Sequence, residues 1–151
     1  MRRSLEGFST IELIIVIGLI GVVALFSTGM GFDAIGRSVI ASERDTFVSL
    51  ILRGARADAL ANIREVSHGI KIDNNAHEYV LFDGTTYSTT SSSNRHIPYS
   101  STGLTVSNTG GNIIVFEQLS GSAITGAGTT TISGNGKTQT IIIRSNGQID
   151  W

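Results

Sequence analysis

Cysteine is absent from the 151-residue chain, and this absence excludes a disulfide framework, a thiolate metal site and the modified cysteine of a lipoprotein signal. An excess of charge of one sign is absent as well, since 11 basic and 12 acidic residues give a formal net charge of −1. Nonspecific binding to nucleic acid or to anionic lipid normally requires a basic excess, so the composition argues against both. The length and the 40% hydrophobic content fit one small domain plus a membrane segment.

The sequence also lacks a recognisable catalytic or metal-binding pattern. No paired metal-ligand spacing links the only three histidines, which are His68, His77 and His96. Residues 73–75 and Asp83 do not follow the ligand pattern of a calcium loop, and turn formation explains them better. Serine, threonine and glycine are abundant without a nucleophile elbow or a phosphate-cradling loop. We therefore expect no enzymatic activity, no cofactor and no metal site.

Charge is scarce near the N-terminus, where Glu12 is the only charged residue from Ile11 to Phe32. A lone carboxylate in hydrocarbon costs about 2.5–3.5 kcal/mol, so Glu12 should have a partner or a function. The run of 22 residues is close to the length of roughly 20 that spans a bilayer. Arg2 and Arg3 precede it, which predicts a cytoplasmic N-terminus and places the rest of the chain after about residue 32 outside.

The segment Gly7-Phe8-Ser9-Thr10-Ile11-Glu12 resembles the processing site of type IV prepilins and type II secretion pseudopilins. The resemblance implies that a membrane peptidase cleaves between Gly7 and Phe8, removes the leader 1–7 and methylates the new N-terminal Phe8. The liberated amine would stand one helical turn before Glu12. Such an ion pair, at about 4 Å and an effective dielectric near 20, gains roughly 4 kcal/mol, which offsets the burial of the acid. The pair can close within one chain or between chains, and the resemblance favours Glu12 of one subunit meeting the N-terminus of its neighbour.

Two other interpretations of this segment remain. An ordinary secretory signal peptide would use Arg2 and Arg3 as its positive region and Leu13–Phe26 as its apolar core. Against it, Glu12 stands at the start of that core, and no small-x-small cleavage site stands out after Phe26. The other interpretation is a plain membrane anchor that keeps its leader.

Helical periodicity continues beyond the membrane segment 8–32 into an amphipathic segment, 33–65. Apolar residues recur there every three to four positions, as expected for one face of a helix: Phe47, Val48, Ile51, Leu52, Ala55, Ala59, Leu60 and Ile63. A helix from Phe8 to about Arg64 would be on the order of 85 Å long. Gly36 and the polar residues 42–45 are the places where it would break or bend.

The remaining residues, 66–151, predict a β-rich head. Apolar-alternating or β-branched runs predict strands at 66–72, 78–82, 104–107, 113–116, 129–133, 138–144 and 148–151. Turns are expected at 73–75, 134–137 and 146–147, and a polar surface loop with a short strand at 83–102. The predicted class is α+β: a long N-terminal helix, half membrane and half amphipathic, packed on an antiparallel sheet or small sandwich, as in type IV pilins.

The head also carries a resemblance. Residues 44–72 (RDTFVSLILRGARADALANIREVSHGIKI) and 140–151 (TIIIRSNGQIDW) look like the helix-to-first-strand stretch and the closing strands of the GspH/FimT group of minor pseudopilins and minor pilins. The resemblance implies a structural subunit of a type II secretion pseudopilus or a type IV pilus, which helps to initiate or cap the filament. The implied partners are the prepilin peptidase and N-methyltransferase, other pilins or pseudopilins through the N-terminal helix, and the inner-membrane assembly platform. The implied location is the inner membrane, with a single pass and an external head.

Two further classes of function stay open. A minor pilin head of this kind can bind DNA or a surface, although the C-terminal region offers only Lys137 and Arg144 as cations for DNA. An exported enzyme anchored by its signal would need an acid–base pair that the sequence does not display. The sequence does not choose between a type II secretion system, a type IV pilus and a competence pilus.

Overall fold

The computed structural model describes residues 9–151, and the side chains of residues 9–24 and 36–151. The chain divides into two compact units, residues 1–35 and residues 36–151, and each is described by itself. Helix α1 (Thr10–Thr46) contributes residues to both units.

The described part of the first unit is helical and apolar. Every side chain from Ser9 to Ala24 is exposed. Among the residues that the structure describes, no helix is both long and apolar enough to cross a membrane. The predicted span over 8–32 is therefore not confirmed, and Phe8 and the side chains of 25–32 lie outside the described residues.

The helical part of the second unit is not one regular α-helix. After α1 comes a π-helical segment, η1 (Phe47–Leu52), then α2 (Arg53–Leu60) and a short 3-10 turn, η2 (Ile63–Glu65). The prediction of an unbroken helix to about Arg64 was wrong, because α2 ends at Leu60 and Asn62 adopts a left-handed conformation with φ 55°. Asparagine accepts that conformation at a helix C-terminus more readily than most residues do. The irregularity lies at η1, after the residues 42–45 that the sequence suggested.

Most of the predicted apolar stripe faces the core. Six of its members are at most 2% exposed: Phe47, Val48, Ile51, Leu52, Ala55 and Ala59. The wider turn of η1 brings four of these side chains to one face. Leu60 and Ile63 were expected on the stripe, but they are 43% and 45% exposed, because α2 ends at Leu60 and the helical period ends with it.

Two antiparallel sheets form the β part of the head. The first has five strands in the order β3-β2-β1-β5-β6. Their bounds are β1 (His68–Asp73), β2 (Glu78–Asp83), β3 (Arg95–Pro98), β5 (Ile113–Phe116) and β6 (Ala123–Thr125). The second has four strands in the order β4-β7-β8-β9, with bounds β4 (Thr105–Asn108), β7 (Gly128–Gly134), β8 (Lys137–Ile143) and β9 (Ile149–Asp150).

The predicted α+β class and its antiparallel pairing are thus confirmed. Strand β3 supplies the short strand expected inside 83–102, and the turn between β7 and β8 contains Asn135 and Gly136, both with positive φ. Strand β6 was not predicted, because three residues are too few to show a period.

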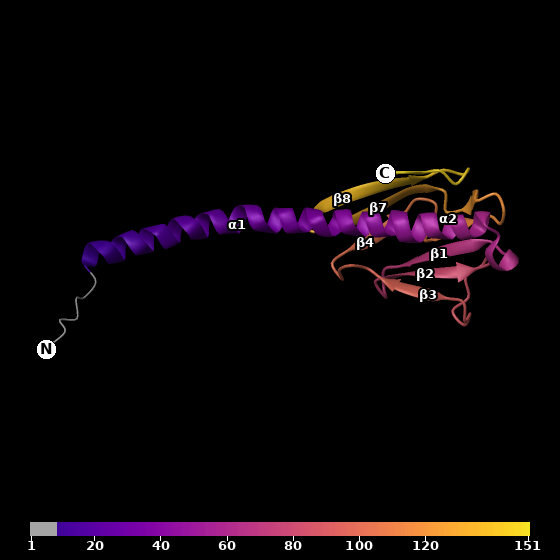
Figure 1. The fold of residues 1–151 in the computed structure, drawn as a ribbon, viewed down its shortest axis with the longest axis horizontal. Coiled ribbons are helices and arrows are strands. Elements are labelled where there is room, and N and C mark those ends of the chain that lie inside the picture. The colour runs from indigo at the N-terminus through magenta and orange to yellow at the C-terminus, as the bar shows by residue number, and fades with distance from the viewer. Residues whose placement is uncertain (1–8) are drawn as a thin grey trace. The chain divides into compact units, whose positions relative to one another are not determined.

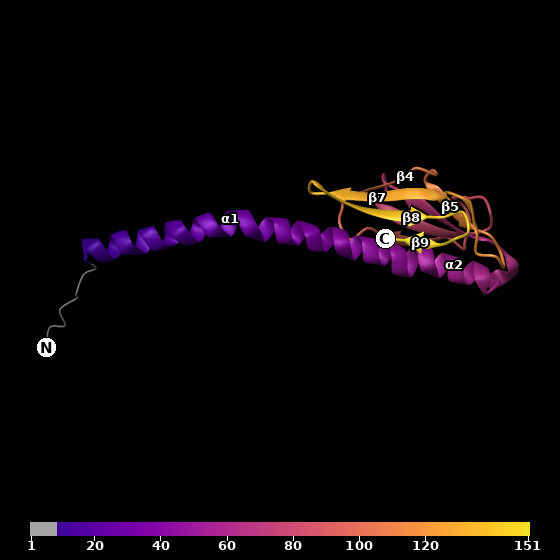
Figure 2. The ribbon, with the colours of Figure 1, turned by 90° about the horizontal axis from the view of Figure 1, so that it is seen from above.

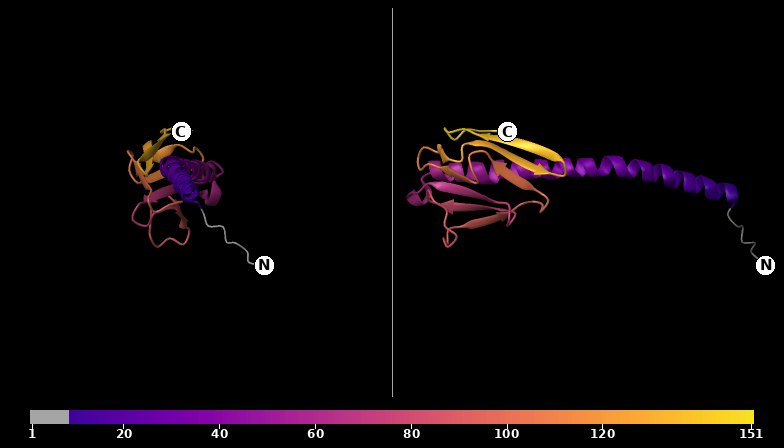
Figure 3. Two further views of the ribbon diagram at one scale, coloured as in Figure 1. Left: turned by 90° about the vertical axis from the view of Figure 1, so that its left-hand side faces the viewer. Right: turned by 180° about the vertical axis from the view of Figure 1, so that it is seen from behind.

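The core of the head lies among the helical segments and the two sheets. In Figure 1, β7 and β8 lie above α2 and β1 to β3 lie below it, and Figure 2 shows that the strands gather on one side of this helix. Seen from behind, β1 to β3 and the C-terminal strands lie at opposite edges of the head (Figure 3). The shared apolar cluster joins residues of η1 such as Ile51, of the first sheet such as Ile70 and Ile114, and of the second sheet such as Ile132 and Ile141. Each of these five is fully buried.

Side-chain amides connect the two sheets. The Asn74 side chain, in the turn between β1 and β2, donates to the carbonyl of Val106 in β4 (2.7 Å) and accepts from its N–H (3.0 Å). The Tyr99 hydroxyl donates to the same amide oxygen (3.1 Å). One side chain thus makes the pair of hydrogen bonds that a neighbouring strand would make with Val106.

Candidate functional site

The predicted processing residues cannot be placed, since Arg2, Arg3, Gly7 and Phe8 all lie outside the described residues. Glu12 is placed: it lies in the first turn of α1 and is exposed. The carbonyl of Ser9 accepts the N–H groups of Glu12 (3.0 Å) and Leu13 (3.1 Å) and so begins the helix. Within the described part of the chain, the Glu12 carboxylate has no hydrogen-bond or ion-pair partner.

The surroundings of Glu12 are apolar on all sides of the helix. Ten large apolar side chains between residues 11 and 23 are 43–68% exposed: Ile11, Leu13, Ile14, Ile15, Val16, Ile17, Leu19, Ile20, Val22 and Val23. A helix that is hydrophobic all round normally lies in a core or a membrane. This segment therefore presents an uncovered apolar surface with a single carboxylate at its start.

A second acidic residue, Glu43 of α1, is only 1% exposed in the core of the head. Its carboxylate accepts a hydrogen bond from the Tyr79 hydroxyl (2.7 Å) and one from the backbone N–H of Ser100 (2.8 Å). Burial, with Glu43 close by, raises the pKa values of Tyr79 and Tyr99 far above the ordinary range of a phenol. Both phenols therefore remain neutral, and Tyr79 remains a donor to the carboxylate.

Sequence reasoning missed Glu43, although one signal was available. Ile40, Glu43 and Phe47 continue the apolar stripe backwards at spacings of three and four, so Glu43 occupies a core position. Because residues 42–45 were interpreted as a polar break in the helix, the core position of Glu43 was not recognised.

The histidines do not form a shared site. His77 lies in the turn between β1 and β2, and His96 in β3 contacts the Glu78 carboxylate (2.8 Å). His68 is buried in β1 beside Asp83. In the residues that the structure describes, no group of three or more metal-ligating side chains occurs.

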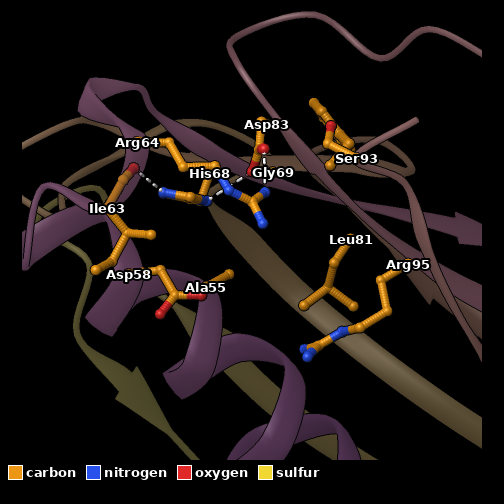
Figure 4. Close-up of a pocket in the computed structure, with 11 residues that line it drawn as sticks. Ala55, Asp58, Ile63, Arg64, His68, Gly69, Leu81, Asp83, Ser93 and Arg95 are labelled. Atoms are coloured by element: carbon orange, nitrogen blue, oxygen red, sulfur yellow. Dashed lines mark hydrogen bonds and ion pairs between the residues drawn. The ribbon is translucent and has the colours of Figure 1, made fainter. Parts of the chain in front are cut away.

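His68 and Asp83 line a cavity of about 120 Å³ at the end of α2 (Figure 4). The His68 ring contacts the Ile63 carbonyl through Nε2 (2.9 Å) and Asp83 Oδ1 through Nδ1 (3.2 Å). Arg64 pairs with the other oxygen of Asp83. The Ile63 carbonyl and Arg64 belong to the connection from α2 to β1. The backbone of this connection is unusual, with φ 58° at Arg64 and 57° at Glu65.

Comparison with known proteins provides one informative match. No protein-family model matches the chain, and no curated protein matches it. Among solved structures, the chain is similar to the minor pseudopilin EPSH from the type II secretion system of Vibrio cholerae, with a TM-score of 0.50 and 12% sequence identity. The match covers 77% of this chain and 94% of that chain. At this identity the similarity shows the fold alone: the chain has the fold of a minor pseudopilin.

Proposed function

We propose that the protein is a structural subunit of a type II secretion pseudopilus or a related pilus, assembled through its N-terminal helix. The observation that carries the proposal is the exposed apolar surface of α1 from Ile11 to Val23, with one carboxylate, Glu12, in its first turn. The pseudopilin fold of the head supports it. The function is thus to pack with like helices rather than to catalyse a reaction.

Processing is the first step of the proposed mechanism. Arg2 and Arg3 orient the precursor in the inner membrane, the prepilin peptidase cleaves between Gly7 and Phe8, and Phe8 is methylated. Lipid covers the apolar helix until assembly, and the helices of neighbouring subunits cover it afterwards. In this proposal the new N-terminal amine of a neighbour satisfies Glu12, which sets the position of the subunit along the filament.

Substitution of Glu12 tests the assembly step. In Glu12→Ala and Glu12→Gln we expect normal cleavage but incorporation into filaments reduced about tenfold or more, because losing 1.4 kcal/mol at the contact already corresponds to a factor of ten. Incorporation is measured as the ratio of sheared filament protein to total protein. Glu65→Ala is the matched control, since Glu65 is exposed and its side chain has no partner among the described residues. Wild-type incorporation of both Glu12 variants would refute the proposal.

Mass spectrometry of the mature N-terminus tests the processing step separately. The expected product begins at Phe8 and carries one extra methyl group. An N-terminus at Met1, or a cut beyond Phe26, would contradict the assignment.

The alternative of a DNA-binding head gains no support from the described residues. Four basic side chains of the head, Arg44, Arg64, Lys71 and Arg144, form ion pairs with carboxylates of the same head. Basic groups held in this way are less available to phosphates.

A further inference from the structure

Some of the charged groups that line the cavity at the end of α2 have an ion-pair partner, and others have none among the described residues. Asp83 contacts both His68 and Arg64, so its charge is compensated. Asp58 of α2 and Arg95 of β3 line the same cavity, and neither has an ion-pair or hydrogen-bond partner among the described residues. In Figure 4, Arg95 stands beside Leu81, apart from the cluster of Arg64, His68 and Asp83.

The position of Arg95 follows from the register of the first sheet. Arg95 is opposite Leu81 in the pairing of β2 with β3, and Leu81 belongs to the core cluster, so both residues face the helical side of the sheet. Strand β3 is an edge strand of this sheet, and Arg95 is exposed there at the mouth of the cavity. The guanidinium of Arg95 therefore lines a hollow and retains unused N–H donors.

The walls of the cavity favour a carboxylate as the group that Arg95 binds. Ala55 and Leu81 are apolar and buried, and they form part of the wall beside the exposed Arg95. The planar fork of a guanidinium matches the two oxygens of a carboxylate. A volume of about 120 Å³ has room for a few water molecules or for one side-chain head group.

Asp58 restricts the choice further. Its carboxylate lines the same cavity from α2, and it repels a doubly charged group such as phosphate more strongly than a singly charged carboxylate. The same carboxylate accepts hydrogen bonds, and the backbone N–H groups of a peptide are suitable donors. Arg95 and Asp58 together fit one acidic side chain carried on a peptide.

We propose that this cavity is a docking site for an acidic side chain of a partner protein, with Arg95 pairing its carboxylate. Ser93 at the rim adds a hydroxyl donor. The proposal concerns a surface of the head and does not depend on whether Glu12 directs assembly.

Binding of small blocked peptides to the full chain in detergent micelles tests the proposal. The probe is N-acetyl-Gly-Glu-Gly-amide, and the readout is the NMR signal of the Arg95 Nε–H group together with the backbone amide of Ser93. We expect a saturable shift in the millimolar range. N-acetyl-Gly-Gln-Gly-amide should bind at least about tenfold more weakly, because it lacks the charge. A loss of about 1.4 kcal/mol of binding free energy lowers the affinity tenfold.

Variants identify the responsible group. Arg95→Gln should weaken binding of the glutamate peptide about tenfold or more, and Arg95→Lys should give an intermediate value, because lysine keeps the charge but loses the fork. Arg144→Gln is the matched control, since Arg144 lies outside the cavity and pairs with Asp150. Because Arg95→Gln loses its own Nε–H signal, its binding is followed at Ser93, and each variant must keep the wild-type melting temperature.

Three outcomes would overturn the proposal. Equal binding of the glutamine peptide would show that the charge is not recognised. Unchanged binding by Arg95→Gln would show that Arg95 is not the receptor. Inorganic phosphate binding as tightly as the glutamate peptide would show a general anion site.

Discussion

Gly147 lies where the closing turn of the chain meets the loop after β5. Its φ is 79°, and a Cβ atom there would come within 1.9 Å of the Gly121 carbonyl oxygen and 2.8 Å of Arg56 Nε. Gly121 also has a positive φ, and Arg56 donates to its carbonyl (3.3 Å). The contact between α2 and the C-terminal strands therefore depends on the absence of a side chain at residue 147.

Gly147→Ala should consequently destabilise the head more than an alanine in an equally left-handed but open position. Gly136→Ala is the matched control, with φ 70° and no atom within 4 Å of the added methyl. We expect about 1 kcal/mol for Gly136→Ala and about 3 kcal/mol for Gly147→Ala, because the second adds a clash to the backbone strain. Urea unfolding measures both, and equal losses would contradict the packing argument.

At the residue scale, sequence reasoning succeeded where the chemistry is local. The turn at Asn135 and Gly136 was predicted, since Asn-Gly accepts positive φ at low cost. The hydrogen-bond partners of Glu43 were not predictable, because Tyr79 and Ser100 lie 36 and 57 residues further along the chain. The free guanidinium of Arg95 likewise depends on the pairing of β2 with β3.

At the scale of elements, the hairpin of β1 and β2 is closed by Asp73. Its Oδ1 accepts the N–H groups of Asn75 and Ala76 (3.1 Å each), and its Oδ2 accepts from Lys71 Nζ (2.7 Å). The hydrogen bond from Lys71, followed by that from the Ala76 N–H, lowers the pKa of Asp73 below its ordinary value of 3.8. The ionised carboxylate is therefore the form that stabilises the hairpin.

The sign of the resulting pH dependence follows from that shift. When the pKa of a carboxyl group is lower in the folded state, the group stabilises the fold fully at any pH above its pKa in the unfolded state. This stabilisation is lost as the pH falls through the pKa in the folded state. We expect the stability of the wild type to decrease below about pH 4, near the ordinary pKa of aspartate. Urea unfolding between pH 2 and 7 should show a smaller decrease for Asp73→Asn.

Asp58→Asn is the control for this acid dependence, since the Asp58 side chain has no partner among the described residues. Its profile should match that of the wild type. Some acid sensitivity should persist in Asp73→Asn, because a hydrogen bond from Arg144 lowers the pKa of Asp150 as well. Identical profiles for Asp73→Asn and the wild type would rule out a role for Asp73.

The long periodic elements were predictable and the irregular ones were not. Strand β5 has the predicted bounds, and the stripe from Phe47 to Ala59 is buried as expected. The π-helical turn of η1 was missed, because it changes the period by which a sequence is interpreted. The exposure of Leu60 depends on where α2 ends, and helix ends are weakly encoded.

At the scale of the whole molecule, the packed core belongs to one unit. All members of the main apolar cluster, from Ile40 to Ile143, lie within residues 36–151. The exposed apolar residues of α1, from Ile11 to Val23, lie in the other unit. Folding and association should therefore be separable by truncation.

A fragment of residues 36–151 should fold cooperatively and remain monomeric in buffer. Its melting temperature should lie within a few degrees of that of the full chain in detergent, because both contain the same core. The full chain should associate when detergent is removed, since the apolar side chains of α1 then have no cover. Circular dichroism and analytical ultracentrifugation measure the two properties, and an unfolded or associating fragment would contradict the division.

The α+β class of the whole molecule was predictable from the spacing of apolar residues, which is typical of a helix in the first part of the chain and of strands afterwards. A small sandwich was one of the two predicted arrangements of the strands, but the assignment of each strand to one of the two sheets was not predictable. It depends on β4 pairing with β7 rather than with its sequence neighbours, and such non-local pairing leaves no periodic signal.

The amide of Asn74 has one more consequence. Strand β4 borders the second sheet, and an unprotected border of this kind invites a foreign strand to add and start aggregation. Because Asn74 occupies both main-chain groups of Val106, an approaching strand finds no continuous ladder there. Asn74 thereby makes this border a poor template for strand addition by a second copy of the head.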